Sequence, residues 1–233
     1  MAENTLAAVE VAVGAGYAVE IDLRLTADGE LVVLHDAMLD RTAAAEGPVA
    51  TRTLAELRAV PLRGTDETLS SLADVFALVS GRAPLFLDVK APRTIARQAA
   101  MAAAVQRALA GYSGATAVMT FEPDLLGLLR RGLPDTPLGI LAGKDIGHAS
   151  VVSRFGRDAM LHTPRTKPDF IAYYAPSLPN PAVRFHRRKR PVIAWTVRTA
   201  QEQDRLAPHA DQIIFEGFVP RDAPGGTADA SSR

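Results

Sequence analysis

The sequence predicts an α/β protein whose parallel sheet closes into an eight-stranded (β/α)8 TIM barrel. Apolar runs of strand length alternate with helical segments along the 233 residues, which is typical of parallel strands joined by crossover helices. About seven such units favour a barrel over an open doubly wound sheet. Polar or aromatic residues lie at or just past the expected strand ends, where barrels build their active sites: Asp22, His35, Lys90, Phe121 and Thr196.

The chain opens on a helix, expected over residues 4–13, because apolar residues recur there at helical spacing and Asn4 or Thr5 can cap its start. Two strands follow, separated by a turn at Ala27-Asp28-Gly29, and they cover Tyr17–Leu25 and Glu30–Leu34. Since the first element is a helix, we expect the barrel to lack its first strand.

Residues 37–64 are polar and Ala-rich and predict a small insertion after the barrel's second strand, with a short helix at Leu54–Arg58. Further strands are expected at Leu85–Lys90, Ala115–Phe121, Leu138–Ala142, Phe170–Tyr174, Val192–Val197 and Gln212–Phe215. Further helices are expected at Leu69–Ser80, Pro92–Leu109, Pro123–Arg131, Asn180–Lys189 and Thr199–Leu206. Residues 1–222 are thus predicted to form one barrel domain, and the tail, 223–233, is predicted to be disordered.

Composition excludes several classes of function. Lys plus Arg equals Asp plus Glu at 26 each, so the net charge does not indicate a nucleic-acid partner. The basic run at His186–Arg190 is interpreted as a charged, solvated helix end rather than a nucleic-acid patch. The absence of Cys excludes disulfides and thiolate metal sites and fits a cytoplasmic protein. No apolar run is long enough for a transmembrane helix, and the N-terminus does not resemble a signal peptide.

The most informative stretch is Gly16 to Asp36. Glu20 and Asp22 lie two apart in an apolar strand, so their carboxylates point to one face, roughly 6.6 Å apart along the strand. Carboxylates surrounded by buried residues need a partner or a metal, and a hard cation is a suitable partner. The second strand then places His35 at its end. The opposing interpretation is an edge strand with two solvated acids.

Glu20, Asp22 and His35 belong to a series of short motifs along the chain, and through that series the sequence resembles the glycerophosphodiester phosphodiesterase family. Glu3-Asn4-Thr5-Leu6 resembles the family's PENT segment, and Glu20-Ile21-Asp22 is similar to its ExD motif. The other matching motifs occur in the family's order: Thr26-Ala27-Asp28-Gly29, His35-Asp36, Arg41-Thr42, Asp88-Val89-Lys90 and Trp195-Thr196-Val197. Each motif is weak alone, but the conjunction is specific.

The resemblance implies a barrel of the phospholipase C-like phosphodiesterase type that hydrolyses glycerophosphodiesters to glycerol 3-phosphate and an alcohol. Carried over, Glu20, Asp22 and Asp88 would hold a divalent cation, Ca²⁺ or Mg²⁺. Lys90 would contact the phosphate, His35 would be one of two catalytic histidines, and Trp195 would line the substrate pocket. The chemistry agrees, because hydrolysis of a phosphodiester needs positive charge beside the phosphate and a group that protonates the leaving alcohol.

The sequence also departs from the family pattern. The family's first strand ends in a His-Arg-Gly segment just before PENT, and this chain starts at Met1-Ala2-Glu3. Either the true start lies upstream of Met1, or the chain is a truncated, catalytically impaired remnant that binds a phosphate ester or a protein. A further alternative is that the chain is the soluble part of a larger membrane protein. Asp88 replaces the family's Glu, and Phe215-Glu216-Gly217 replaces its usual last-strand ending.

Overall fold

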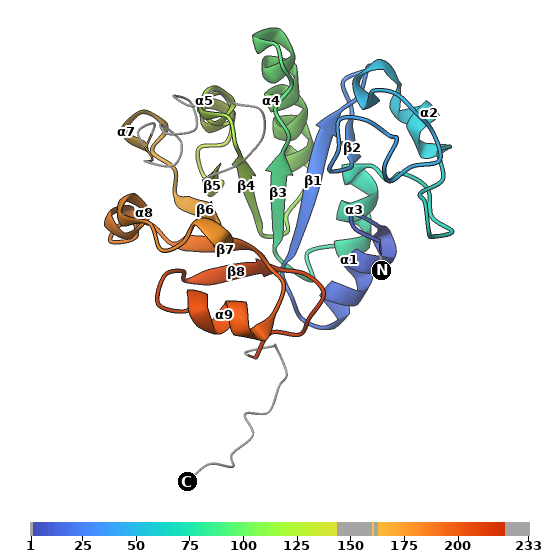
Figure 1. The fold of residues 1–233 in the computed structure, drawn as a ribbon. Helices are drawn as coiled ribbons and strands as arrows, with labels where there is room; N and C mark the ends of the chain where they lie inside the picture. Colours follow the sequence, from blue (N-terminus) through green and yellow to red (C-terminus); the bar gives the residue numbers. More distant parts are fainter. Residues whose placement is uncertain (1, 144–159, 161–162, 222–233) are drawn as a thin grey trace.

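A curled sheet of eight strands forms the centre of the computed structural model (Figure 1). The structure describes residues 2–143, 160 and 163–221, so the predicted tail lies outside the described residues. The strands follow the order β2-β1-β3-β4-β5-β6-β7-β8, and all but β2 run parallel. Their bounds are β1 Val19–Leu25, β2 Leu31–Val33, β3 Leu85–Val89, β4 Thr116–Thr120, β5 Leu138–Ala142, β6 Phe170–Tyr174, β7 Val192–Val197 and β8 Gln212–Phe215.

Helices surround the sheet on its outer side (Figure 1). They are α1 Leu6–Gly14, α2 Leu54–Arg58, α3 Leu72–Val79, α4 Ile95–Ala110, α5 Pro123–Gly132, α7 Thr163–Thr166, α8 Pro181–His186 and α9 Ala200–Leu206, with short 3₁₀ turns η1 Val49–Thr51 and η2 Ala175–Ser177. The predicted alternation of strands and helices is therefore confirmed. No helix in the described part of the chain has the length and apolar character needed to cross a bilayer.

Capping residues decide where several helices begin. Ser71 and Asp74 form a reciprocal capping box, so α3 starts at Leu72 and not at Leu69 as the pattern predicts. Thr94 caps the N-terminus of α4, so this helix begins at Ile95 and not at Pro92 as predicted. Thr5 caps α1 by accepting a hydrogen bond from the backbone of Ala8. Asn4, the other predicted cap, is therefore free for a different role.

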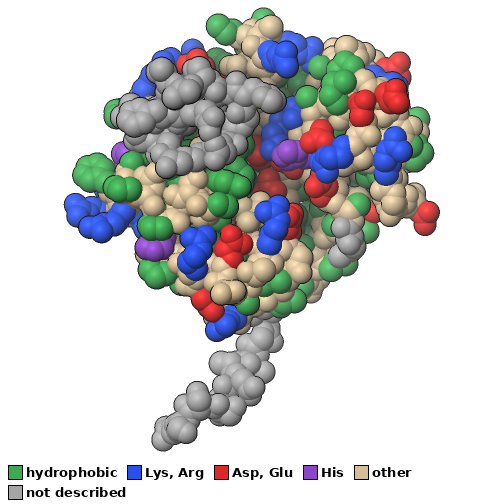
Figure 2. All heavy atoms as spheres, in the orientation of Figure 1, with side chains coloured by type: hydrophobic (Ala, Val, Ile, Leu, Met, Phe, Trp, Pro, Cys, Tyr) green, Lys and Arg blue, Asp and Glu red, His purple; other side chains and the backbone are tan. Residues whose placement is uncertain are grey.

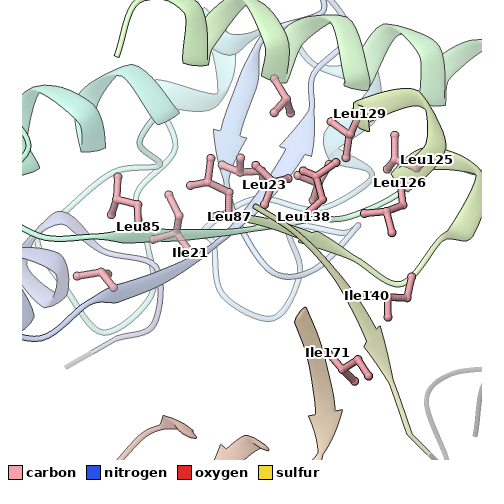
Figure 3. Close-up of a cluster of buried hydrophobic side chains, with 14 of the residues drawn as sticks. Ile21, Leu23, Leu85, Leu87, Leu125, Leu126, Leu129, Leu138, Ile140 and Ile171 are labelled. Carbon is pink, nitrogen blue, oxygen red and sulfur yellow. The ribbon is translucent and has the colours of Figure 1, made fainter. Parts of the chain in front are cut away.

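Alternation along β1 and β3 separates two apolar layers. Ile21, Leu23 and the matching residues of β3 pack outward against the helices in the main core (Figure 3). The side chains between them face the inside of the curl, because Glu20 pairs in register with Phe86 and Asp22 with Asp88. Phe86 packs there in a second cluster built from Ala117, Met119, Leu141, Phe170, Ala172 and Ile193. The acidic residues therefore share the interior face with an apolar cluster.

The predicted insertion, residues 37–64, contributes to none of the named strands of the sheet. It contains η1 and α2 and folds around an apolar cluster separate from the main core: Val32, Leu34, Leu39, Ala43, Val49, Leu57, Val60, Leu62 and Leu69. This cluster extends from the hairpin strand β2 to the start of α3. The insertion is thus anchored directly beside the strand end that carries His35.

The sheet differs from eight parallel barrel strands in one respect. One of its eight strands, β2, is antiparallel to its neighbour β1, and no ladder joins β1 to β8 among the described strands. The rings of Tyr17, just before β1, and Phe215 of β8 lie 5.1 Å apart, so the first and last parallel strands still approach each other. The described strands therefore form a curled, mostly parallel sheet of barrel type, joined at this point by side chains.

Candidate functional site

Three carboxylates converge on the inner face of the sheet. Glu20 and Asp22 come from β1 and Asp88 from β3, and each offers an oxygen that lies within 4.8 Å of the others. Asp22 and Asp88 are buried, with 7% and 4% of their surfaces exposed. The register of β1 and β3 is the cause, because it places Asp22 directly beside Asp88. The structure thus brings together the three residues predicted to bind a cation.

Lys90 lies between two of these carboxylates. Its Nζ is 2.7 Å from Asp22 Oδ1 and 2.6 Å from Asp88 Oδ2. Burial raises the pKa of Asp88 to about 6, although Lys90 opposes that rise. Burial together with the charges of Asp22 and Asp88 raises the pKa of Glu20 well above its ordinary value. The three acids therefore repel one another, and one ammonium group does not neutralise them.

Asp22 was predicted to lie at or past the end of its strand, and this prediction was wrong. It lies three residues before the end of β1, because β1 extends beyond it to pair with β2 at Leu23–Leu25. Lys90 and Phe121 do follow the last residues of β3 and β4, and Thr196 lies one residue before the end of β7. The carboxylates consequently lie deeper in the curl than the loops that surround it.

Asn4 lies at the site, although the sequence pattern did not predict a role for it there. Its side-chain amide donates a 2.7 Å hydrogen bond to Asp22 Oδ2, and its Oδ1 accepts a 3.0 Å bond from the backbone N–H of Asp22. The backbone of Asn4 has φ 58°, a left-handed conformation that Asn adopts more readily than most residues. A residue interpreted as a possible helix cap therefore fixes the orientation of a carboxylate. Its membership of the PENT-like segment was the available signal.

His35 lies at the rim of the site, two residues after β2, with about half of its side chain exposed. Its Nδ1 is 2.7 Å from Asp36 Oδ1, and Arg24 donates to the His35 carbonyl oxygen at 2.9 Å. Arg41 donates to Asp36 Oδ2 at 2.5 Å and also pairs with Glu3. Hydrogen bonds from Arg41 and His35 lower the pKa of Asp36 to about 2. A charged carboxylate therefore holds the imidazole by one nitrogen.

An aromatic wall stands beside Lys90. The ring of Trp195 lies 5.5 Å from that of Phe121 and 5.3 Å from that of Tyr174, and Lys90 Nζ is 5.8 Å from the centre of the Phe121 ring. Trp195 Nε1 is buried and has no hydrogen-bond partner in the described structure. A pocket of about 400 Å³ adjoins Lys90 and is lined by Arg24, Ala91, Pro92, Arg93, Gln98, Phe121 and Glu122. Of the three rings, Phe121 lines this pocket, whereas Trp195 and Tyr174 pack behind it.

The carboxylate cluster suits a hard divalent cation. Asp88 Oδ1 is buried without a hydrogen-bond partner in the described structure, so an acceptor is left unsatisfied. All three ligand candidates offer oxygen, the donor that Ca²⁺ and Mg²⁺ prefer. Figure 2 shows acidic side chains at the base of a hollow near the centre of the face, with basic side chains and a histidine beside them.

The other histidines do not join this cluster within the described residues. His209 lines a separate groove beside α8, and His186 ends α8 itself. His148 and His162 lie outside the described residues. Among the described histidines, His35 alone lies by the carboxylates.

Comparisons with known proteins point to one family. A model of the glycerophosphoryl diester phosphodiesterase family matches residues 1–209. A Mycobacterium tuberculosis protein that carries a glycerophosphodiester phosphodiesterase name is 54% identical over 57 residues, 24% of this chain and 21% of that protein. The match thus spans about a fifth of the curated relative's length.

Solved structures agree on the fold. A Silicibacter pomeroyi protein named as a glycerophosphoryl diester phosphodiesterase superposes with a TM-score of 0.78 and 26% identity, covering 91% of this chain and 84% of that one. An Oleispira antarctica phosphodiesterase, described in complex with the product sn-glycerol-3-phosphate, superposes with a TM-score of 0.76 and 19% identity, covering 91% and 86%.

Proposed function

Because this chain belongs to the glycerophosphoryl diester phosphodiesterase family, we propose that it hydrolyses glycerophosphodiesters to glycerol 3-phosphate and an alcohol. Glycerophosphocholine and glycerophosphoethanolamine are suitable substrates. The observation that carries the proposal is the convergence of three carboxylates and Lys90 beside His35 in a chain of this family. A neighbour of the same fold has been described with the product sn-glycerol-3-phosphate, which supports a small phosphate ester as the ligand.

We assign Glu20, Asp22 and Asp88 to a divalent cation, Ca²⁺ or Mg²⁺. When bound, such a cation supplies positive charge to the non-bridging oxygens of the phosphate. Lys90 adds a second positive charge at the same place, because two buried carboxylates hold its ammonium beside the cluster. Those carboxylates raise the pKa of Lys90 against the opposing effect of burial, so the ammonium stays charged.

His35 is proposed to move a proton to or from the reacting phosphodiester. Asp36 accepts from Nδ1–H, which leaves Nε2 as the nitrogen that exchanges protons with substrate or water. Arg41 in turn holds Asp36, so the imidazole keeps one tautomer and one orientation. Trp195, Phe121 and Tyr174 are proposed to line the substrate pocket, because their rings pack together next to Lys90.

The test is hydrolysis of glycerophosphocholine with Ca²⁺ or Mg²⁺ added after treatment with a chelator. We expect release of glycerol 3-phosphate that requires the cation and that falls by at least about a hundredfold in His35→Ala. Thr65→Ala, a substitution directly after the insertion, is the control and should retain activity. Turnover that persists without divalent cations would contradict the metal assignment.

A second candidate is a module that binds a phosphate ester or a protein without hydrolysing it. The observation in its favour is that the described residues place a single histidine at the site, whereas the resemblance to the family implies two catalytic histidines. The discriminating measurement compares the 233-residue chain with a chain extended by any in-frame upstream codons that encode a His-Arg-Gly strand. Binding of glycerol 3-phosphate by both, with turnover by neither, would support the binding module.

A further inference from the structure

A cationic and aromatic surface lies on α8 and the residues that follow it. We define the α8 surface as Arg184, Phe185, Arg188 and Lys189. All four are exposed, and Phe185 leaves 65% of its surface in solvent. Blue and green side chains gather at the left edge of Figure 2, where Figure 1 shows α8. None of the four residues lines the pocket beside Lys90, so this surface is separate from the proposed active site.

The positive charges of the α8 surface are available for a partner. Arg187 and Arg190, which lie in the same basic run, are tied to the fold: Arg187 pairs with Asp211 at 2.8 Å, and Arg190 donates to the Pro168 carbonyl. Arg184, Arg188 and Lys189 make no ion pair or side-chain hydrogen bond within the described part of the chain. Residues 184–190 contain no acid, although the whole chain is neutral. The positive charge here is therefore local and uncompensated.

An apolar groove adjoins these cations. It has a volume of about 690 Å³, and its apolar lining comes from Leu178, Pro179, Pro181, Val183, Phe185 and Pro208. Arg184 and Arg188 line the same groove. Exposed aromatic and apolar side chains next to unpaired cations match a surface whose charge is negative and whose interior is apolar, which describes an anionic lipid bilayer.

We propose that the α8 surface docks the protein peripherally on membranes that contain anionic phospholipid. Arg184, Arg188 and Lys189 contact the lipid phosphates, while Phe185 enters the region between headgroups and acyl chains. An anionic bilayer complements both features, whereas a nucleic acid or a polypeptide of acidic residues alone would complement only the charge. Because binding of such a surface depends on both its buried apolar area and its attraction to anionic lipid, loss of either the cations or Phe185 should weaken binding.

The experiment is co-sedimentation of the full chain with vesicles of phosphatidylcholine alone and of phosphatidylcholine mixed with phosphatidylglycerol. We expect binding to the mixed vesicles only, and we expect salt to weaken it. Each cation near an anionic surface strengthens binding about fivefold, so R184Q combined with R188Q should lower the partition coefficient roughly 25-fold. Phe185→Ser should lower it several-fold at unchanged charge.

Matched controls separate this surface from general effects. Arg63→Gln removes an exposed arginine and Val11→Ser an apolar side chain that is 55% exposed, and both should bind vesicles as the unaltered chain does. Thermal unfolding should be unchanged in every variant. Absence of vesicle binding, equal binding to neutral vesicles, or equal binding by the α8 and control variants would overturn the proposal. Binding to polyglutamate or to DNA in place of anionic vesicles would also overturn it.

Discussion

Asp22 is the residue on which the site's other groups converge. One of its oxygens lies 2.7 Å from Lys90 Nζ and the other accepts from Asn4 at the same distance. Lys90 places a positive charge beside Asp22, whereas Asn4 orients the Asp22 carboxylate through two hydrogen bonds. Groups that orient a metal ligand contribute to cation affinity without contacting the cation.

Asn4→Ala should therefore weaken divalent-cation binding by about tenfold, because Asp22 loses the bond that fixes its carboxylate. Titration calorimetry with Ca²⁺ or Tb³⁺ luminescence measures the affinity independently of activity. Thr5→Ala is the matched control, since Thr5 caps α1. It should cost about 1 kcal/mol of unfolding free energy and leave the affinity unchanged. Equal cation affinities for Asn4→Ala and the unaltered chain would remove Asn4 from the site.

Lys90→Met should destabilise the cation-free protein by about 3 kcal/mol, because it leaves two buried carboxylates without their partner. Added Ca²⁺ should restore much of this loss, since a bound cation neutralises the same oxygens. Chemical unfolding with chelator and with Ca²⁺ measures both effects. Lys189→Met, at an exposed position, is expected to change stability by less than about 0.5 kcal/mol. A Lys90→Met protein as stable as Lys189→Met would contradict the buried pairing.

Asp36 predicts a specific pH dependence of stability. Its pKa is lowered to about 2 in the folded protein, so its pairing stabilises the fold fully above the unfolded pKa of about 3.9. That contribution is lost as pH falls from about 4 to 2. Because Arg41 is half exposed, we expect only about 1 kcal/mol. In acid unfolding, Asp36→Asn should lack this loss between pH 4 and 2, whereas Asp40→Asn should retain it.

At the scale of the element, the alternation along β1 places the core-packing side chains on one face and the proposed ligands on the other. Leu23 and Ile21 face the helices while Glu20 and Asp22 face the inside of the curl. The hairpin with β2 then extends β1 beyond the carboxylates and brings His35 back to their rim. One strand therefore supplies both the packing and two proposed ligands.

Leu23→Ala should lower the free energy of unfolding by about 3 kcal/mol, because Leu23 is fully buried in the main core. Once folded, the variant should retain its cation affinity, since the opposite face of β1 is unchanged. Val11→Ala, on the exposed side of α1, should change stability by less than about 0.5 kcal/mol. Urea unfolding combined with a Tb³⁺ titration measures both quantities. A large loss of affinity in folded Leu23→Ala would show that the two faces are coupled.

At the scale of the molecule, the sheet curls so that Tyr17 and Phe215 meet, although no ladder joins β1 and β8 among the described strands. The insertion folds around its own apolar cluster beside the site, and the α8 surface lies apart from it. The proposed catalysis, the packing of the insertion and the proposed membrane contact are consequently assigned to different groups of residues. A substitution in one group should therefore change the property assigned to that group and leave the other two properties unchanged.

Much of the fold could be predicted because its causes are local. Apolar periodicity and caps identified every strand of the sheet, and they placed the helix at Leu54–Arg58 correctly. Errors arose where tertiary contacts intervene. The helix predicted over Asn180–Lys189 ends at His186, where Arg187 turns toward Asp211 and the carbonyls of Pro208 and Ala210. The short helix α7 has no pattern that predicts it.

The sequence by itself determined that Glu20 and Asp22 share one face, because strand residues two apart always do. It also determined the family, through the order of motifs from Glu3 to Val197. Only the tertiary structure decided that Asp88 lies opposite Asp22, that Lys90 joins them and that Asn4 orients one of them. Strand register and side-chain hydrogen bonds between distant segments depend on how the whole sheet packs, and spacing along the chain does not specify them.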